Sequence, residues 1–411
     1  MVSVATTGVL DAGGTELFPL GISEPPPLGG KTPDGRDAFE ELGSGGVNFM
    51  RLGIQNWSNA GLTGQIKAAT DMMDAGHPHG IYGWLWLGKT ANFAGPDAAS
   101  NQQLLEKIVA GTKDHLGLGA YKGIDEPHNP KDVNVKKNQD FRTQPPGMIA
   151  ALNHLKTIDP AHPLVVTHEP ISPAAQLMPY RAACDIAGVD IYPVSYPPGA
   201  HAETANHDLS LVGDITQKLK KVAGPKPVWV TLQMAWSGML PPKNVPRFPS
   251  AFDERFMAYQ AIVNGARGLL FFGGHLKQVM RPIDAKTGWN WTFWQLVLKP
   301  LLLELTSKTV LPALVAPDSG ATVTADAKDV QVLTRQGEKM LYVIAVRCSP
   351  TITSVVNFSG LPKRNDGKAI GGGSVAFEYA DGAFRGVGVS GGKFSDWFGP
   401  HDVHVYLFPL A

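Results

Sequence analysis

Residues 118–128 read LGAYKGIDEPH, an apolar run that ends abruptly in two acids and a proline. Proline has no amide hydrogen to offer a neighbouring strand, and it holds the residue before it in extended backbone. The run therefore predicts a buried strand that ends at Glu126, with Asp125 and Glu126 at its carboxyl end. Because carboxylates are costly to place beside a core, this pattern indicates a functional site.

Seven further apolar runs of strand length occur in the first 308 residues, and amphipathic stretches separate them. In one such stretch, 209–224 (LSLVGDITQKLKKVAG), apolar residues recur at spacings of three and four, which is typical of a helix. The eight expected strands are 17–22, 47–53, 80–88, 118–126, 163–169, 186–193, 227–233 and 268–275. Strand and helix units that alternate in this way predict an α/β fold, a (β/α)8 TIM barrel over residues 1–308.

The pattern changes after residue 308. Short segments there alternate apolar and polar residues, and glycine and aspartate separate them. This alternation is typical of antiparallel sheet with one buried face. We therefore expect a small antiparallel β-sandwich domain over residues 309–411.

Charge and hydropathy exclude several kinds of partner. The 36 Lys and Arg residues balance the 36 Asp and Glu residues, so neither nucleic acid nor a membrane surface is an expected partner. No apolar stretch approaches the roughly 20 residues that cross a bilayer, and the first residues show no signal peptide. A secreted or periplasmic chain that had lost its signal would look the same, so compartment and oligomeric state stay open. Cys184 and Cys348 have apolar neighbours and are expected to be free thiols.

The carboxyl ends of barrel strands carry the chemistry of TIM barrels. Polar and aromatic residues stand at or just beyond these ends: Glu24, Arg51, Trp86, Asp125, Glu126, Glu169, Asp190, Tyr192, Gln233 and His275. The loops add Trp236 and Trp291, which with Trp86 are candidate surfaces for stacking. We expect these side chains to gather around one hollow.

Strand alternation assigns the two acids of the fourth strand to different faces. Residues two apart share a face, which pairs Glu126 with Ile124 and turns Asp125 the other way. Glu126, as the last residue, is expected to face the open mouth. Asp125 is expected to turn toward a neighbouring strand or a loop amide.

Two carboxylates across a cleft suit the cleavage of a glycosidic bond. One must be protonated to supply a proton to the leaving oxygen, and the other must be ionised to attack the anomeric carbon or to activate water. Together with the indole rings, they predict a carbohydrate substrate. No cofactor or metal is expected, because the pair His77 and His79 precedes the third strand and so lies at the opposite end of the barrel.

The segments GIDEPH, VDIYP, KPVWVTLQ, GARGLLFFGG and FGPHDVHVY together carry a family resemblance that spans nearly the whole chain. They resemble TIM-barrel glycoside hydrolases of the large clan in which the fourth strand ends in an acid-base glutamate followed by proline, and in which a β-sandwich follows the barrel. The resemblance implies hydrolysis of O-glycosidic bonds in a neutral oligo- or polysaccharide. It also implies Glu126 as the general acid, with Asp125 where many members have an asparagine that contacts the sugar's 2-hydroxyl.

One departure from that family concerns the seventh strand. Gln233 stands where the clan has its nucleophilic glutamate, and an amide is a poor nucleophile. The second carboxylate is then expected to be Asp190 or Glu169, with Glu24 as a further candidate, while Gln233 would bind a sugar hydroxyl. Two alternatives follow: a non-catalytic carbohydrate-binding barrel, and a transglycosylase or lyase on the same scaffold.

Overall fold

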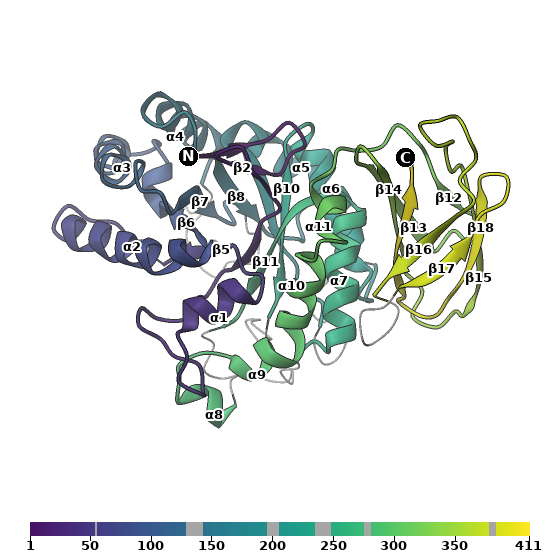
Figure 1. The fold of residues 1–411 in the computed structure, drawn as a ribbon. Helices are drawn as coiled ribbons and strands as arrows, with labels where there is room; N and C mark the ends of the chain where they lie inside the picture. The colour runs from purple at the N-terminus through teal and green to yellow at the C-terminus, as the bar shows by residue number, and fades with distance from the viewer. Residues whose placement is uncertain (54–55, 129–142, 195–204, 235–247, 275–280, 378–383) are drawn as a thin grey trace.

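The computed structural model describes residues 1–53, 56–128, 143–194, 205–234, 248–274, 281–377 and 384–411. Eight parallel strands close into a barrel in the ring order β10-β11-β4-β5-β6-β7-β8-β9 (Figure 1). In chain order they are β4 (Leu20–Ile22), β5 (Phe49–Leu52), β6 (Tyr82–Trp86), β7 (Leu118–Asp125), β8 (Leu164–His168), β9 (Ile186–Asp190), β10 (Val228–Gln233) and β11 (Ala266–Phe272). Each expected strand overlaps one of these, so the predicted TIM barrel is confirmed.

The helices around the barrel form where the apolar residues follow helical spacing. In α6 the apolar residues Leu211, Ile215, Leu219 and Val222 are buried along one side. Helix α7 begins with a capping box, in which Ser250 and Asp253 satisfy each other's backbone amides. The longer helices are α1 (Ala38–Ser44), α2 (Leu62–Gly76), α3 (Ala98–Thr112), α4 (Pro145–Ile158), α6 (Leu211–Ala223), α7 (Ala251–Val263) and α10 (Lys299–Leu305). The short ones are α5 (Ala174–Leu177), α8 (Pro282–Ala285), α9 (Trp291–Phe293) and α11 (Leu311–Val315). None of the described helices has the length and apolar character needed to span a membrane.

A small sheet that the sequence pattern did not predict closes the barrel at the amino-terminal ends of its strands. It consists of β1 (Val2–Val4), β2 (Leu10–Ala12) and β3 (Glu16–Leu17). Val2 and Leu10 pack against side chains from the first halves of the barrel strands, among them Trp84 and Trp229. The amino-terminal end of the lumen is therefore filled with hydrocarbon.

The C-terminal region forms the expected antiparallel sandwich, drawn in yellow-green beside the barrel in Figure 1. One sheet has the order β12-β15-β18, and the other has the order β13-β14-β19-β16-β17. The strands are β12 (Thr324–Ala325), β13 (Val330–Gln336), β14 (Met340–Arg347), β15 (Ser354–Ser359), β16 (Gly372–Ala376), β17 (Arg385–Gly388), β18 (Lys393–Phe398) and β19 (Val403–Pro409).

Barrel and sandwich share one hydrophobic core. Tyr342 and Ile344 of β14 and Val405 of β19 belong to the same buried cluster as the barrel helices. Arg255 of α7 donates to the carbonyl of Val403 (3.1 Å) and forms an ion pair with Glu304 of α10 (2.9 Å). The two parts therefore bury apolar surface against each other.

Candidate active site

The barrel lumen has two layers of different chemistry. Alternate residues of each strand point inward, and the first layer is apolar: Phe49, Trp84, Ala120, Val165, Ile186, Trp229 and Leu270. Two residues further along each strand stand Arg51, Trp86, Lys122, Thr167, Gly188, Thr231 and Phe272. Most of this second layer is polar, so the barrel has a closed apolar floor and an open polar end.

A β-bulge in β7 decides which acid faces the lumen. Lys122 pairs with Val165 and Asp125 pairs with Thr167, so three steps along β7 match two steps along β8. The extra residue shifts the alternation by one. Lys122 and Asp125 therefore share the inward face, and the expectation that Asp125 turns away from the lumen is wrong.

Lys122 is a buried cation in the centre of this polar layer. Its ammonium forms an ion pair with Asp125 and donates a hydrogen bond to the Thr167 hydroxyl (3.0 Å). It also lies 4.8 Å from the ring centre of Trp84 and 5.2 Å from that of Trp86. Ionic, hydrogen-bonding and cation–π contacts together compensate for its burial.

Asp190, at the end of β9, has a perturbed acidity. It accepts hydrogen bonds from the Thr231 hydroxyl and from the phenol of Tyr192. Burial, reinforced by the negative charge of Asp125, raises the pKa of Asp190 from 3.8 to about 6. Asp190 is thus a carboxylic acid that holds its proton under mildly acidic conditions.

Glu126 follows directly after β7 and lies close to Asp190. Its backbone has φ 42°, in the left-handed region that residues with side chains seldom occupy. Its amide donates to the carbonyl of Thr167 (2.8 Å), which fixes this turn against β8. Burial, and after it the charges of Asp190 and Glu126, raise the pKa of Tyr192. Glu126 and Asp190 therefore lie within electrostatic reach of one phenol.

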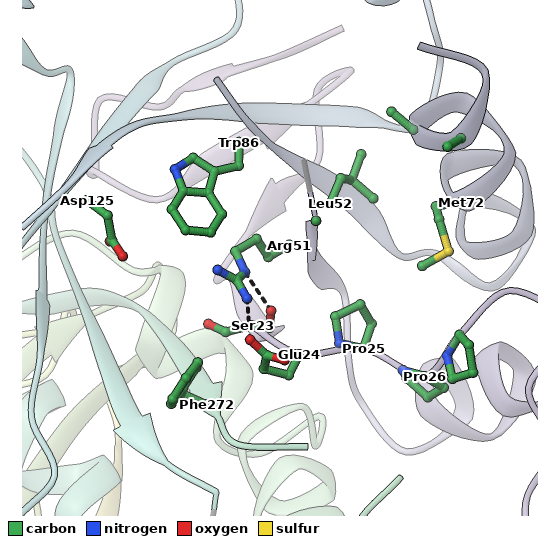
Figure 2. Close-up of a pocket in the computed structure, with 14 residues that line it drawn as sticks. Ser23, Glu24, Pro25, Pro26, Arg51, Leu52, Met72, Trp86, Asp125 and Phe272 are labelled. Carbon is green, nitrogen blue, oxygen red and sulfur yellow. Dashed lines mark hydrogen bonds and ion pairs between the residues drawn. The ribbon is translucent and has the colours of Figure 1, made fainter. Parts of the chain in front are cut away.

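The other side of the mouth carries a second ion pair and an indole platform. Arg51 pairs with Glu24 and donates from Nε to the carbonyl of Ser23 (2.7 Å). Its guanidinium lies 4.7 Å from the ring centre of Trp86. Figure 2 shows Trp86 and Arg51 between Asp125 and Glu24 in one cavity. The cavity has a volume of about 650 Å³, which is in the range of small-ligand pockets.

Three of the predicted site residues are engaged elsewhere. Glu169 Oε2 accepts the amides of Ile171 (2.6 Å) and Ser172 (2.9 Å), so this carboxylate caps the turn after β8. Both amide atoms of Gln233 bond to the backbone of Val194, and the side chain is fully buried. Trp291 is also buried, with its ring 4.6 Å from that of Trp289. Trp236 and His275 lie outside the described residues.

The sequence reasoning missed Lys122 and Phe272 as site residues. Phe272 stacks on Tyr192, with ring centres 5.7 Å apart, and lines the cavity. A signal existed for Lys122, since a single lysine in the middle of an apolar strand requires a partner. Across the described ranges, no cluster of three or more His, Cys, Asp or Glu side chains is arranged to hold a metal ion.

Comparisons with known proteins agree with this fold. No profile of a known protein family matches the chain, and no curated protein sequence is significantly similar. Many solved structures do match. A GH30 endoxylanase from Clostridium papyrosolvens is 13% identical with a TM-score of 0.54, and the match covers 100% of this chain and 99% of the other. A glycoside hydrolase family 5 protein from Bacteroides vulgatus is 13% identical with a TM-score of 0.63 and coverage of 99% and 93%.

The match is not limited to those two proteins. An alpha-amylase from Anoxybacillus is 10% identical with a TM-score of 0.55, covering 96% of this chain and 98% of that one. At such low identity the similarity demonstrates a common architecture, the barrel with its following sheets, over nearly the full length. Chemistry has to be argued from the residues themselves.

Proposed function

We propose that this protein is a glycoside hydrolase that cleaves the O-glycosidic bond of a neutral carbohydrate. One observation carries the proposal: Asp125, Glu126 and Asp190 crowd around one mouth, and the pKa of Asp190 is raised to about 6. Glycosidic cleavage needs one carboxyl group that keeps its proton and one that is ionised. The platform of Trp86 beside them suits the apolar face of a sugar ring.

The electrostatics favour a particular division of roles. Below about pH 6 Asp190 is protonated and can give its proton to the oxygen of the leaving group. Glu126 would then be the ionised partner that attacks the anomeric carbon or removes a proton from the attacking water. The sequence pattern had given the acid role to Glu126, and the raised pKa of Asp190 is the reason to exchange the two. Asp125, paired with Lys122, would position the sugar.

The charges around the mouth favour a neutral substrate. Arg51 is paired with Glu24 and Lys122 with Asp125, so both nearby cations are already compensated. The remaining carboxylates would repel an acidic sugar. Several of the structural neighbours are glycoside hydrolases, which makes this chemistry the first to test on the scaffold.

The test is a screen of aryl glycosides and defined oligosaccharides at about pH 5, with Asp190→Asn and Glu126→Gln as variants. Each variant should lose turnover by at least about a hundredfold, the usual scale of general acid–base catalysis. Glu40→Gln changes an exposed acid of α1 and is the matched control. Full activity in either site variant, with the control unchanged, would refute the assigned roles.

A second candidate is a barrel that binds sugar without cleaving it. The observation that favours this alternative is Gln233, whose amide is fully engaged by Val194 at the strand end where the related clan has its nucleophile. Binding of an oligosaccharide measured by calorimetry, with no product after prolonged incubation, would support this alternative.

A further inference from the structure

The cavity at the barrel mouth is divided into two chemically different halves. The half toward the lumen contains Asp125, Trp86 and the Arg51–Glu24 ion pair. The other half runs outward over the end of β5, between the loop after β4 and helix α2. Figure 2 shows this outer half on the far side of Glu24 from Asp125. We call it the apolar trough, and it is lined by Pro25, Pro26, Pro27, Leu52, Ala68 and Met72.

The side chains of the apolar trough cannot recognise a sugar. None of the six carries a nitrogen or an oxygen atom, so none can exchange a hydrogen bond with a hydroxyl group. None is aromatic, so the trough also lacks the flat surface on which a pyranose ring stacks. A sugar unit placed against these walls would lose hydrogen bonds to water without replacement.

The backbone of the trough offers little more. Three consecutive prolines, Pro25 to Pro27, supply no amide hydrogen. Two of the neighbouring carbonyls are already used: that of Glu24 accepts from the Trp289 indole (2.7 Å), and that of Pro27 accepts from the Gly30 amide (2.8 Å). The trough is therefore suited to hydrocarbon.

We propose that the substrate is a glycoside with an apolar aglycone, such as an alkyl, aryl or terpenoid group, which lies in the apolar trough. This inference rests on the proposed glycosidase function for the bond that is cleaved, but the apolar binding half can be tested separately. The sugar lies on the side of Trp86 and Asp125. The Glu24–Arg51 pair marks the border, and the aglycone extends beyond it.

The experiment measures binding of S-linked alkyl thioglycosides, which resist acid-catalysed cleavage, to the intact protein by calorimetry. Methyl, butyl and octyl thioglycosides of glucose, galactose and xylose are compared below the concentrations at which they form micelles. Burial of a methylene group tightens binding about fourfold. Coverage of about four methylenes would therefore make the octyl compound bind roughly two-hundredfold more tightly than the methyl compound.

Met72→Gln places an amide of similar size in the trough and should remove at least about tenfold of this gain, while the methyl thioglycoside binds as before. Met178→Gln changes a methionine outside the trough that is 47% exposed and is the matched control. Equal affinity for the methyl and octyl compounds would overturn the inference. So would an octyl preference that is unaffected by Met72→Gln.

The two proposals fail in different ways. If the protein hydrolyses glycosides but shows no dependence on alkyl length, the glycosidase stands and the apolar aglycone is wrong. If alkyl length governs binding through Met72 but no glycoside is hydrolysed at any pH, the apolar site stands and the hydrolase proposal is wrong.

Discussion

Replacing Asp190 by Asn should stabilise the protein at neutral pH and have little effect in acid. The pKa of Asp190 is raised in the folded state from 3.8 to about 6, mainly by burial. Below pH 3.8 the group is protonated in both the folded and the unfolded chain, so it contributes nothing to the pH dependence of stability. Above pH 6 it is ionised in both states, and the folded state bears the cost of holding that charge.

The size of the effect follows from the shift in pKa. About two pKa units correspond to roughly 3 kcal/mol of unfolding free energy at neutral pH. Asparagine is neutral at every pH and keeps an oxygen that can accept from Thr231 or Tyr192. Any lost hydrogen bond would shift stability equally at both pH values. The difference between the two pH values therefore isolates the charge.

The assay is urea unfolding of the wild type and Asp190→Asn at pH 4 and pH 7.5. The gain in unfolding free energy should be larger at pH 7.5 by roughly 2 to 3 kcal/mol. Glu40→Gln, on the surface of α1, should give no such difference. A substitution effect that is the same at both pH values, or larger at pH 4, would refute the raised pKa and with it the proton-holding role of Asp190.

Three further predictions concern the neighbours of Asp190 and the sandwich. Asp125→Asn should lower the pKa of Asp190, because it removes the negative charge that helps to raise it; carbon-13 NMR titration of the aspartate carboxyls would measure this, and an unchanged or higher value would contradict it. Lys122→Met should raise the pKa of Asp190 and lower the unfolding free energy by about 1 kcal/mol, since it leaves the partly exposed Asp125 without its cation; an unaltered melting temperature would contradict the second expectation. Removal of residues 309–411 should expose the apolar surface that β14 and β19 cover and make the barrel aggregate; a monomeric, cooperatively unfolding barrel in gel filtration and calorimetry would oppose this.

The sequence was sufficient to predict the barrel because each of its strands is a short apolar run bounded by glycine, proline or polar residues. It was also sufficient to predict that Asp125, Glu126 and Asp190 gather at one end, because parallel strands place their carboxyl ends together. The sheet β1–β3 was missed because strands of two or three residues are too short to show a period.

The direction in which a site side chain points, and the partner that it bonds, were predicted wrongly or left open, because tertiary contacts decide both. The facing of Asp125 depends on a bulge between Lys122 and Asp125, and Gly123 inside an apolar run was only a weak sign of it. Gln233 and Glu169 stand at strand ends as expected, but the backbone of Val194 takes up both amide atoms of Gln233, and two backbone amides take up one oxygen of Glu169. A sequence pattern gives the position of such a side chain along a strand and not the partner it finds.

The bulge in β7 has a consequence for how this mouth could change over evolution or in the laboratory. With the same residues on a regular strand, Ile124 and Glu126 would share the inward face of Lys122 and Asp125 would turn outward. Deleting Gly123 would leave two steps between Lys122 and Asp125, so Asp125 would stay in the lumen on a strand that no longer needs the bulge. The pairing of β7 with β8 thus decides which of the two acids the barrel mouth uses, although both are present in the sequence.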